Sequence, residues 1–204
     1  MRAPAHRARR TVSSSILSIA SATFFLSGCV LVRSSQRDYL SNQTALEAVA
    51  KAVGYQVDPA RYQLVAVEVH EDLITLQYRG VEKVGDSAWV VRFSEKSTEQ
   101  NPEAISDIYS LIPLLEEGRK GFVVVEDGER KVAGTVARFV RYRFDSPVSG
   151  EDGKPFAAHG IVVTLRRTEE GVAVVYQIKL DNHGDRDDVT WDDLAPFFEP
   201  LSRG

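Results

Sequence analysis

A group of potential metal ligands lies near the C-terminus, where carboxylates and one imidazole crowd into a stretch with the composition of a loop. Calcium and zinc are bound by such oxygen and nitrogen donors. Its members are Asp181, His183, Asp185, Asp187 and Asp188. Aligned with a twelve-residue calcium loop over 181–192, the stretch places Arg186 where glycine permits the sharp turn, and it ends in Asp rather than the longer Glu. We therefore predict a solvated acidic turn, keep Asp181, His183 and Asp185 as weak metal candidates, and expect no cofactor.

Ser87 is a candidate nucleophile because it follows Gly85 and Asp86. This block is similar to the nucleophile block of GDSL-type hydrolases, in which an exposed serine needs a nearby histidine base and an acid that orients the base. Here the block precedes a predicted strand, and the segment 181–183 lacks the two-residue gap that this family places between its acid and its histidine. A polar turn between strands explains the block better. We therefore expect no enzyme, and a periplasmic hydrolase stays the second alternative.

Five arginines fall on predicted strands that can be neighbours in one sheet. Their planar guanidinium groups suit bidentate recognition of carboxylates. The five are Arg138, Arg141, Arg143, Arg166 and Arg167. We treat them as candidate partner-binding residues that could grip carboxylates of a protein partner or of peptidoglycan. A polar outer face paired with neighbours such as Glu169 and Glu170 is the alternative interpretation.

The N-terminal region has the three zones of a secretory signal peptide. A basic stretch, 1–10, precedes an apolar and small-residue stretch, 11–25, which is shorter than the ~20 residues that cross a bilayer. Export places the chain where disulfides persist, yet it contains a single cysteine, Cys29, so no intramolecular disulfide can form.

The residues that end this leader, Leu26, Ser27, Gly28 and Cys29, resemble the lipobox of bacterial lipoproteins. The resemblance implies that a peptidase recognises Leu26, Ser27 and Gly28 and cuts after Gly28, and that the Cys29 thiol carries a diacyl group with chains such as palmitate. Val30 follows the cysteine instead of Asp. Under the Gram-negative sorting rule this points to the outer membrane, facing the periplasm.

Charge and composition divide the chain into three parts. Residues 1–28 are the signal peptide, 29–42 a lipidated tether, and 43–204 a single periplasmic α+β domain. The four arginines of the leader leave 21 basic and 29 acidic groups in the rest, a balance of −8. Because phosphate backbones repel such a domain, we expect no nucleic acid among its partners.

Hydrophobic periodicity predicts helix, three strands, helix, four strands and a short helix. The ranges are a helix over 42–52, strands over 62–69, 73–79 and 89–93, a helix over 101–118 kinked at Pro113, and a hairpin of 122–125 and 132–144 around Asp127-Gly128. They continue with a final hairpin, in which a strand containing Ile161, Val163 and Leu165 and a strand over 172–180 are joined by a turn at 169–171, and with a short helix over 191–198. The order predicts an α+β fold with an antiparallel sheet of about seven strands and two main helices on one face. A cystatin-like curved sheet is the nearest architecture by analogy.

These observations favour a lipid-anchored envelope protein that acts as a non-catalytic binding, assembly or inhibitor/immunity module. The membrane, through lipid on Cys29, and an envelope protein or peptidoglycan are the expected partners. A carrier that holds a lipid or other apolar ligand in a concave sheet is the first alternative.

Overall fold

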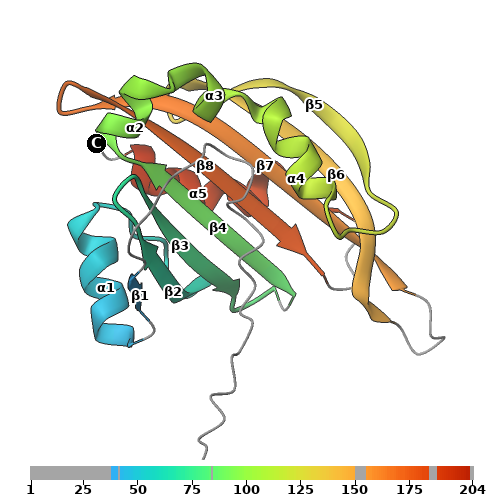
Figure 1. Cartoon of the computed structure of the whole chain (residues 1–204). Helices are drawn as coiled ribbons and strands as arrows, with labels where there is room; N and C mark the ends of the chain where they lie inside the picture. Colours follow the sequence, from blue (N-terminus) through green and yellow to red (C-terminus); the bar gives the residue numbers. More distant parts are fainter. Residues whose placement is uncertain (1–37, 41, 84, 150–154, 184–187, 203–204) are drawn as a thin grey trace, which may run out of the picture.

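One antiparallel sheet of eight strands forms the centre of the computed structural model, which describes residues 38–40, 42–83, 85–149, 155–183 and 188–202. The strand order is β1-β2-β3-β4-β8-β7-β6-β5, so two meanders meet where β4 pairs with β8 (Figure 1). The strands are β1 Asp38–Leu40, β2 Tyr62–Val69, β3 Leu73–Gly80, β4 Asp86–Phe93, β5 Val123–Val132, β6 Thr135–Ser149, β7 Pro155–Glu169 and β8 Val172–Asn182. The helices are α1 Gln43–Ala52, α2 Glu95–Gln100, α3 Pro102–Ser106, the 3-10 turn η1 Ile108–Leu111, α4 Ile112–Glu116 and α5 Trp191–Ser202.

The predicted α+β class is confirmed, with seven strands of eight residues or more and the three-residue β1 added at one edge. The predicted single helix over 101–118 is wrong, because this region is divided into α3, η1 and α4. Pro102 begins α3, the Asp107 side chain caps η1 by accepting from the Tyr109 N–H at 3.1 Å, and Pro113 lies in the first turn of α4. The second long helix is instead α5, whose twelve residues continue past the expected end although Pro196 and Pro200 lie inside it.

Helices cover both faces of the sheet, not one as the order of elements suggested. On one face, α1 and α5 pack against the larger apolar core, through residues such as Leu46 and Phe197. On the other, η1 and α4 cover β6 and β7, while Ile105 of α3 packs on Val175 of β8. Figure 1 shows α2 to α4 lying along one side of the sheet and α5 on the opposite side. We call these the α5 face and the α4 face.

The predicted turn at Asp127-Gly128 is also wrong, because β5 runs straight through it. Val132 pairs with Thr135, so the chain reverses at Ala133 and Gly134. Both turn residues have positive φ, 46° and 80°. Two successive positive φ values match the right-handed twist of a hairpin, and this pairing extends β5 to ten residues. The expected turn at 169–171 is confirmed, since Glu169 pairs with Val172.

Candidate functional site

A buried carboxylate, Asp181, is the centre of a polar cluster on the α4 face. Its side chain is 1% exposed, and it lies 2.6 Å from the Lys179 Nζ and 3.1 Å from the Arg119 Nη2. The Tyr142 hydroxyl donates to the same carboxylate at 2.5 Å. Two strands and the α4–β5 loop therefore supply three donors to one buried anion, which is the arrangement that makes its burial tolerable.

The charges in this cluster shift each other's protonation. Burial lowers the pKa of Lys179 to about 8, although the neighbouring Asp181 opposes that shift. For Asp181, burial alone would raise the pKa, but Lys179 and Arg119 outweigh it and the net pKa is lowered. Burial also raises the pKa of Tyr142 well above its usual value. Asp181 is therefore an anion and Tyr142 a neutral donor at physiological pH.

The structure gathers the residues of the serine-hydrolase hypothesis without linking them. Ser87 faces Asp181 across the β4–β8 ladder, and the His183 N–H donates to the Gly85 carbonyl at 3.1 Å, so all lie at one end of these two strands. Among the described residues, however, neither the Ser87 Oγ nor the His183 Nδ1 has a hydrogen-bond partner. Asp181 is occupied by the three donors named above, and burial lowers the pKa of His183. This geometry lacks the hydrogen bond between nucleophile and base that activates a serine.

Asp86 of the same block is a core residue rather than part of the expected polar turn. It is buried within β4, accepts from the Asn182 Nδ2 at 2.5 Å and accepts from the Tyr62 hydroxyl at 3.1 Å. The strand therefore starts earlier than the sequence suggested.

The weak metal candidates do not assemble into a site in the part of the chain that the structure describes. Asp181 already forms an ion pair with Lys179, and Asp185 lies outside the described residues. Asp188 forms an ion pair with Arg141. Over the described residues, no group of three histidine, cysteine or acidic side chains is placed to hold a metal ion.

The five candidate arginines do not form one stripe, because successive strand residues point to opposite faces. Arg141, Arg143 and Arg167 lie on the α5 face, and Arg138 and Arg166 on the α4 face. Within the part of the chain that the structure describes, Arg138, Arg141 and Arg167 have internal partners.

These partners are acidic side chains and a backbone carbonyl. The Arg138 Nε lies 3.1 Å from Glu129, and Arg141 pairs with Glu126 at 2.7 Å as well as with Asp188. Arg167 donates to the carbonyl of Leu201 near the end of α5. Arg141 and Arg167 therefore hold elements of the fold together, which the sequence alone could not show.

The strand β5 forms one edge of the sheet, and it is the most exposed of the long strands. Among the described residues it pairs only with β6, and seven of its ten residues are exposed. Two of these are apolar, Val123 and Val125, which are 44% and 56% exposed. Val125 is also the residue that the ladder with β6 skips, in a bulge. An edge strand with these properties is a template for pairing with another chain.

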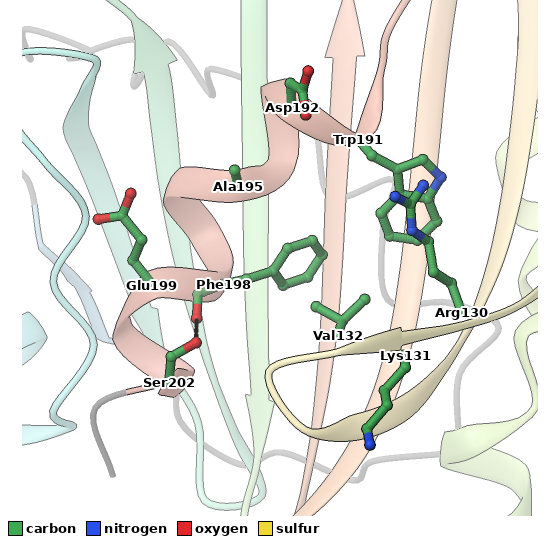
Figure 2. A pocket seen from close by; sticks show the side chains of 9 residues that line it. All are labelled: Arg130, Lys131, Val132, Trp191, Asp192, Ala195, Phe198, Glu199 and Ser202. Carbon is green, nitrogen blue, oxygen red and sulfur yellow. Dashed lines mark hydrogen bonds between the residues drawn. The ribbon is translucent and has the colours of Figure 1, made fainter.

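A hollow of about 520 Å³ adjoins this edge on the α5 face. Its lining residues come from β5 and α5, and they are Arg130, Lys131, Val132, Trp191, Asp192, Ala195, Phe198, Glu199 and Ser202. Figure 2 shows Val132 and the Phe198 ring directed into the hollow, with the charged ends at its border. The Arg130 guanidinium lies 4.6 Å from the centre of the Trp191 ring. Sequence reasoning missed both features, because it placed a turn in the middle of β5.

Comparisons with known proteins assign the chain to no family. No family model matches the chain, and no curated protein or solved structure shows significant similarity to it. In the described residues, no helix is long and apolar enough to span a membrane. The segment 1–37, which contains Cys29 and the candidate lipobox, lies outside the described residues, as do Asp185 and residues 150–154.

Proposed function

We propose that this chain is a lipid-anchored protein of the bacterial envelope that recognises a macromolecular partner without catalysing a reaction. The single observation that carries the proposal is the exposed ten-residue edge strand β5, with Val123 and Val125 open to solvent. Unpaired strand edges with exposed apolar side chains expose a protein to unwanted association. A partner that pairs with β5 and covers Val123 and Val125 would prevent this unwanted association.

The anchor in this proposal is the lipid on Cys29, with the leader 1–28 removed. Each buried acyl methylene contributes about 0.8 kcal/mol, so two or three long chains give durable attachment. With Val30 after the cysteine, the domain would face the periplasm from the outer membrane. The tether is short, so partner recognition takes place near the bilayer.

The packing of the sheet favours partner recognition over carriage of an apolar ligand. A carrier needs a lined apolar space, but the α5 face is filled by side chains such as Leu194 and Phe197, which are fully buried. The hollow beside β5 has four charged side chains among its nine lining residues. It suits one side chain of a partner better than an acyl chain.

The proposal is tested by introducing a charged side chain into the edge strand β5. Val125→Asp should remove the assembly that the wild-type protein forms when native membranes are solubilised in mild detergent, because an incoming strand would desolvate the new carboxylate. The measurement is the apparent mass of the protein on a native gel, with thermal unfolding measured in parallel.

The matched control is Val81→Asp. Val81 is 50% exposed in the β3–β4 connection, so it is as accessible as Val125 but remote from β5. We expect Val81→Asp to keep the wild-type assembly. Equal behaviour of the two variants, or an assembly that persists in Val125→Asp, would overturn the proposal.

A further inference from the structure

We infer that β5 accepts an extended segment of a partner protein as an additional strand, and that this segment is basic on one face and apolar on the other. The inference rests on the proposed function and specifies the partner's chemistry. An edge strand hydrogen-bonds to one neighbour only, so alternate N–H and C=O groups point outward along it. Extended peptides bind such edges through these groups, while their alternating side chains give specificity.

The α4 face of the edge carries two carboxylates, Asp127 and Glu129, followed by one cation, Lys131, which lies opposite Val136 of β6. Asp127 and Glu129 point to this face, since they lie opposite Val140 and Arg138 of β6. Asp127 accepts from the Tyr109 hydroxyl at 2.7 Å, and Glu129 lies 3.1 Å from Arg138. Both contacts are at the protein surface, and a carboxylate has about four acceptor positions. Each carboxylate can therefore also receive a lysine or arginine from an added strand.

A second copy of this chain fits the same edge less well than a segment with basic side chains opposite Asp127 and Glu129. Residues directly opposed in an antiparallel pair share a face, so a two-fold pairing of β5 with itself must be centred on a residue. Centred on Gly128, it places Asp127 against Glu129, and centred on 126, 127, 129 or 130 it places a charge against its own copy. Like charges directly opposed destabilise a sheet. The registers centred on 128, 129 and 130 also oppose an acidic to a basic side chain, such as Glu126 to Arg130. A partner with basic side chains opposite both Asp127 and Glu129 avoids every like-charge pair at these two positions.

The α5 face of the edge supplies an apolar anchor site. Arg130 and Val132 point to this face and border the hollow, whose floor includes Val132, Trp191 and Phe198. Its volume of about 520 Å³ is within the usual range of small binding sites. A strand laid along β5 projects every second side chain over this face. An aliphatic or aromatic side chain at that position would be buried in the hollow.

The test uses two synthetic peptides and the full-length protein purified in detergent. Both peptides are ten residues long and alternate a charged residue with valine, with one phenylalanine among the valines, and they differ only in carrying lysine or glutamate. Amide hydrogen exchange reports where a strand is added, because new hydrogen bonds slow exchange. We expect the lysine peptide to slow exchange over 123–132 by about tenfold and the glutamate peptide to have no effect.

Two variants separate the charge from the edge itself. Asp127→Asn with Glu129→Gln should weaken protection by the lysine peptide about tenfold, while Glu82→Gln, an exposed residue remote from β5, should not. Equal protection by both peptides, protection elsewhere, or none at saturating lysine peptide would overturn the inference. If the lysine peptide fails but Val125→Asp still abolishes the native assembly, only the partner chemistry is wrong. If Val125→Asp leaves the assembly intact, the proposed function itself fails.

Discussion

At the residue scale, the cluster around Asp181 leaves no room for a side chain at Gly160. A Cβ at this position would lie 2.4 Å from ring atoms of Tyr142 and 2.5 Å from the Asp181 Oδ1. Gly160→Ala must therefore displace a buried ring or a buried carboxylate, and we expect it to reduce the free energy of unfolding by about 3 kcal/mol. Thr164→Ala, a buried change on the same face of β7, should cost less than half as much. Chemical denaturation of the two variants measures the difference, and equal losses would contradict this packing.

The lowered pKa of the buried Lys179 should make the free energy of unfolding depend on pH. Its folded pKa of about 8 lies below the ordinary 10.5, so between these values the unfolded chain binds more protons than the folded one. Stability contributed by this group should therefore rise with pH. From pH 8 to 9.5, below the titration of tyrosine, the free energy of unfolding should increase by about 2 kcal/mol relative to Lys179→Met. Parallel pH profiles of wild type and variant would show that Lys179 titrates normally.

At the element scale, the start of α5 depends on Thr190 and Asp193. The Asp193 carboxylate accepts from the Thr190 N–H at 2.8 Å and from its hydroxyl at 2.9 Å, and it also pairs with Lys83. Removing the hydroxyl in Thr190→Ala leaves a buried carboxylate with one donor fewer, so we expect a loss of about 1 kcal/mol. Thr168→Ala, at an exposed position near the end of β7, should be neutral by the same denaturation measurement. A neutral Thr190→Ala would show that the Thr190 N–H and Lys83 are sufficient partners for the Asp193 carboxylate.

The elements that the sequence predicted well are those with strong alternation. In β8, alternate residues such as Val174 and Ile178 are buried on the α5 face, and the strand was expected within two residues of its true end. The helix α1 was also expected, because Asn42 has the side chain of an N-cap and accepts from the Thr44 N–H at 3.1 Å. Periodicity detects such elements because their apolar side chains recur at regular spacing on the face that packs against the larger core.

The features that the sequence failed to predict depend on tertiary context. The sequence Asp-Gly often forms a hairpin turn. However, β5 and β6 form a longer hydrogen-bonded ladder when the chain turns at Ala133-Gly134 than when it turns at Asp127-Gly128. This error concealed the exposed edge that now carries the proposed function. The cluster around Asp181 was equally hidden, since Arg119 comes from a loop 62 residues away and only folding brings it to the carboxylate.

At the scale of the whole molecule, the anchor is a separate prediction from the fold. Cys29→Ala should abolish lipid labelling and leave an unprocessed precursor, because only a thiol accepts the thioether-linked lipid. Intact-mass measurement of the wild type and the variant checks this directly. Ser27→Thr keeps the cysteine and makes a modest change in the cleavage motif, so lipid labelling should persist there. A wild-type mature chain that starts at another residue and carries no lipid would contradict the anchor.

If a partner covers β5 in the envelope, amide hydrogen exchange of the wild-type protein will detect the cover. Exchange is compared between native envelope fragments and the same full-length protein purified in detergent. We expect residues 123–132 to exchange about tenfold more slowly in the envelope, and β2, which lies toward the opposite edge of the sheet, to exchange at the same rate in both samples. Equal exchange of 123–132 in both samples would show that the edge is uncovered in the envelope, and the proposed function would then be wrong.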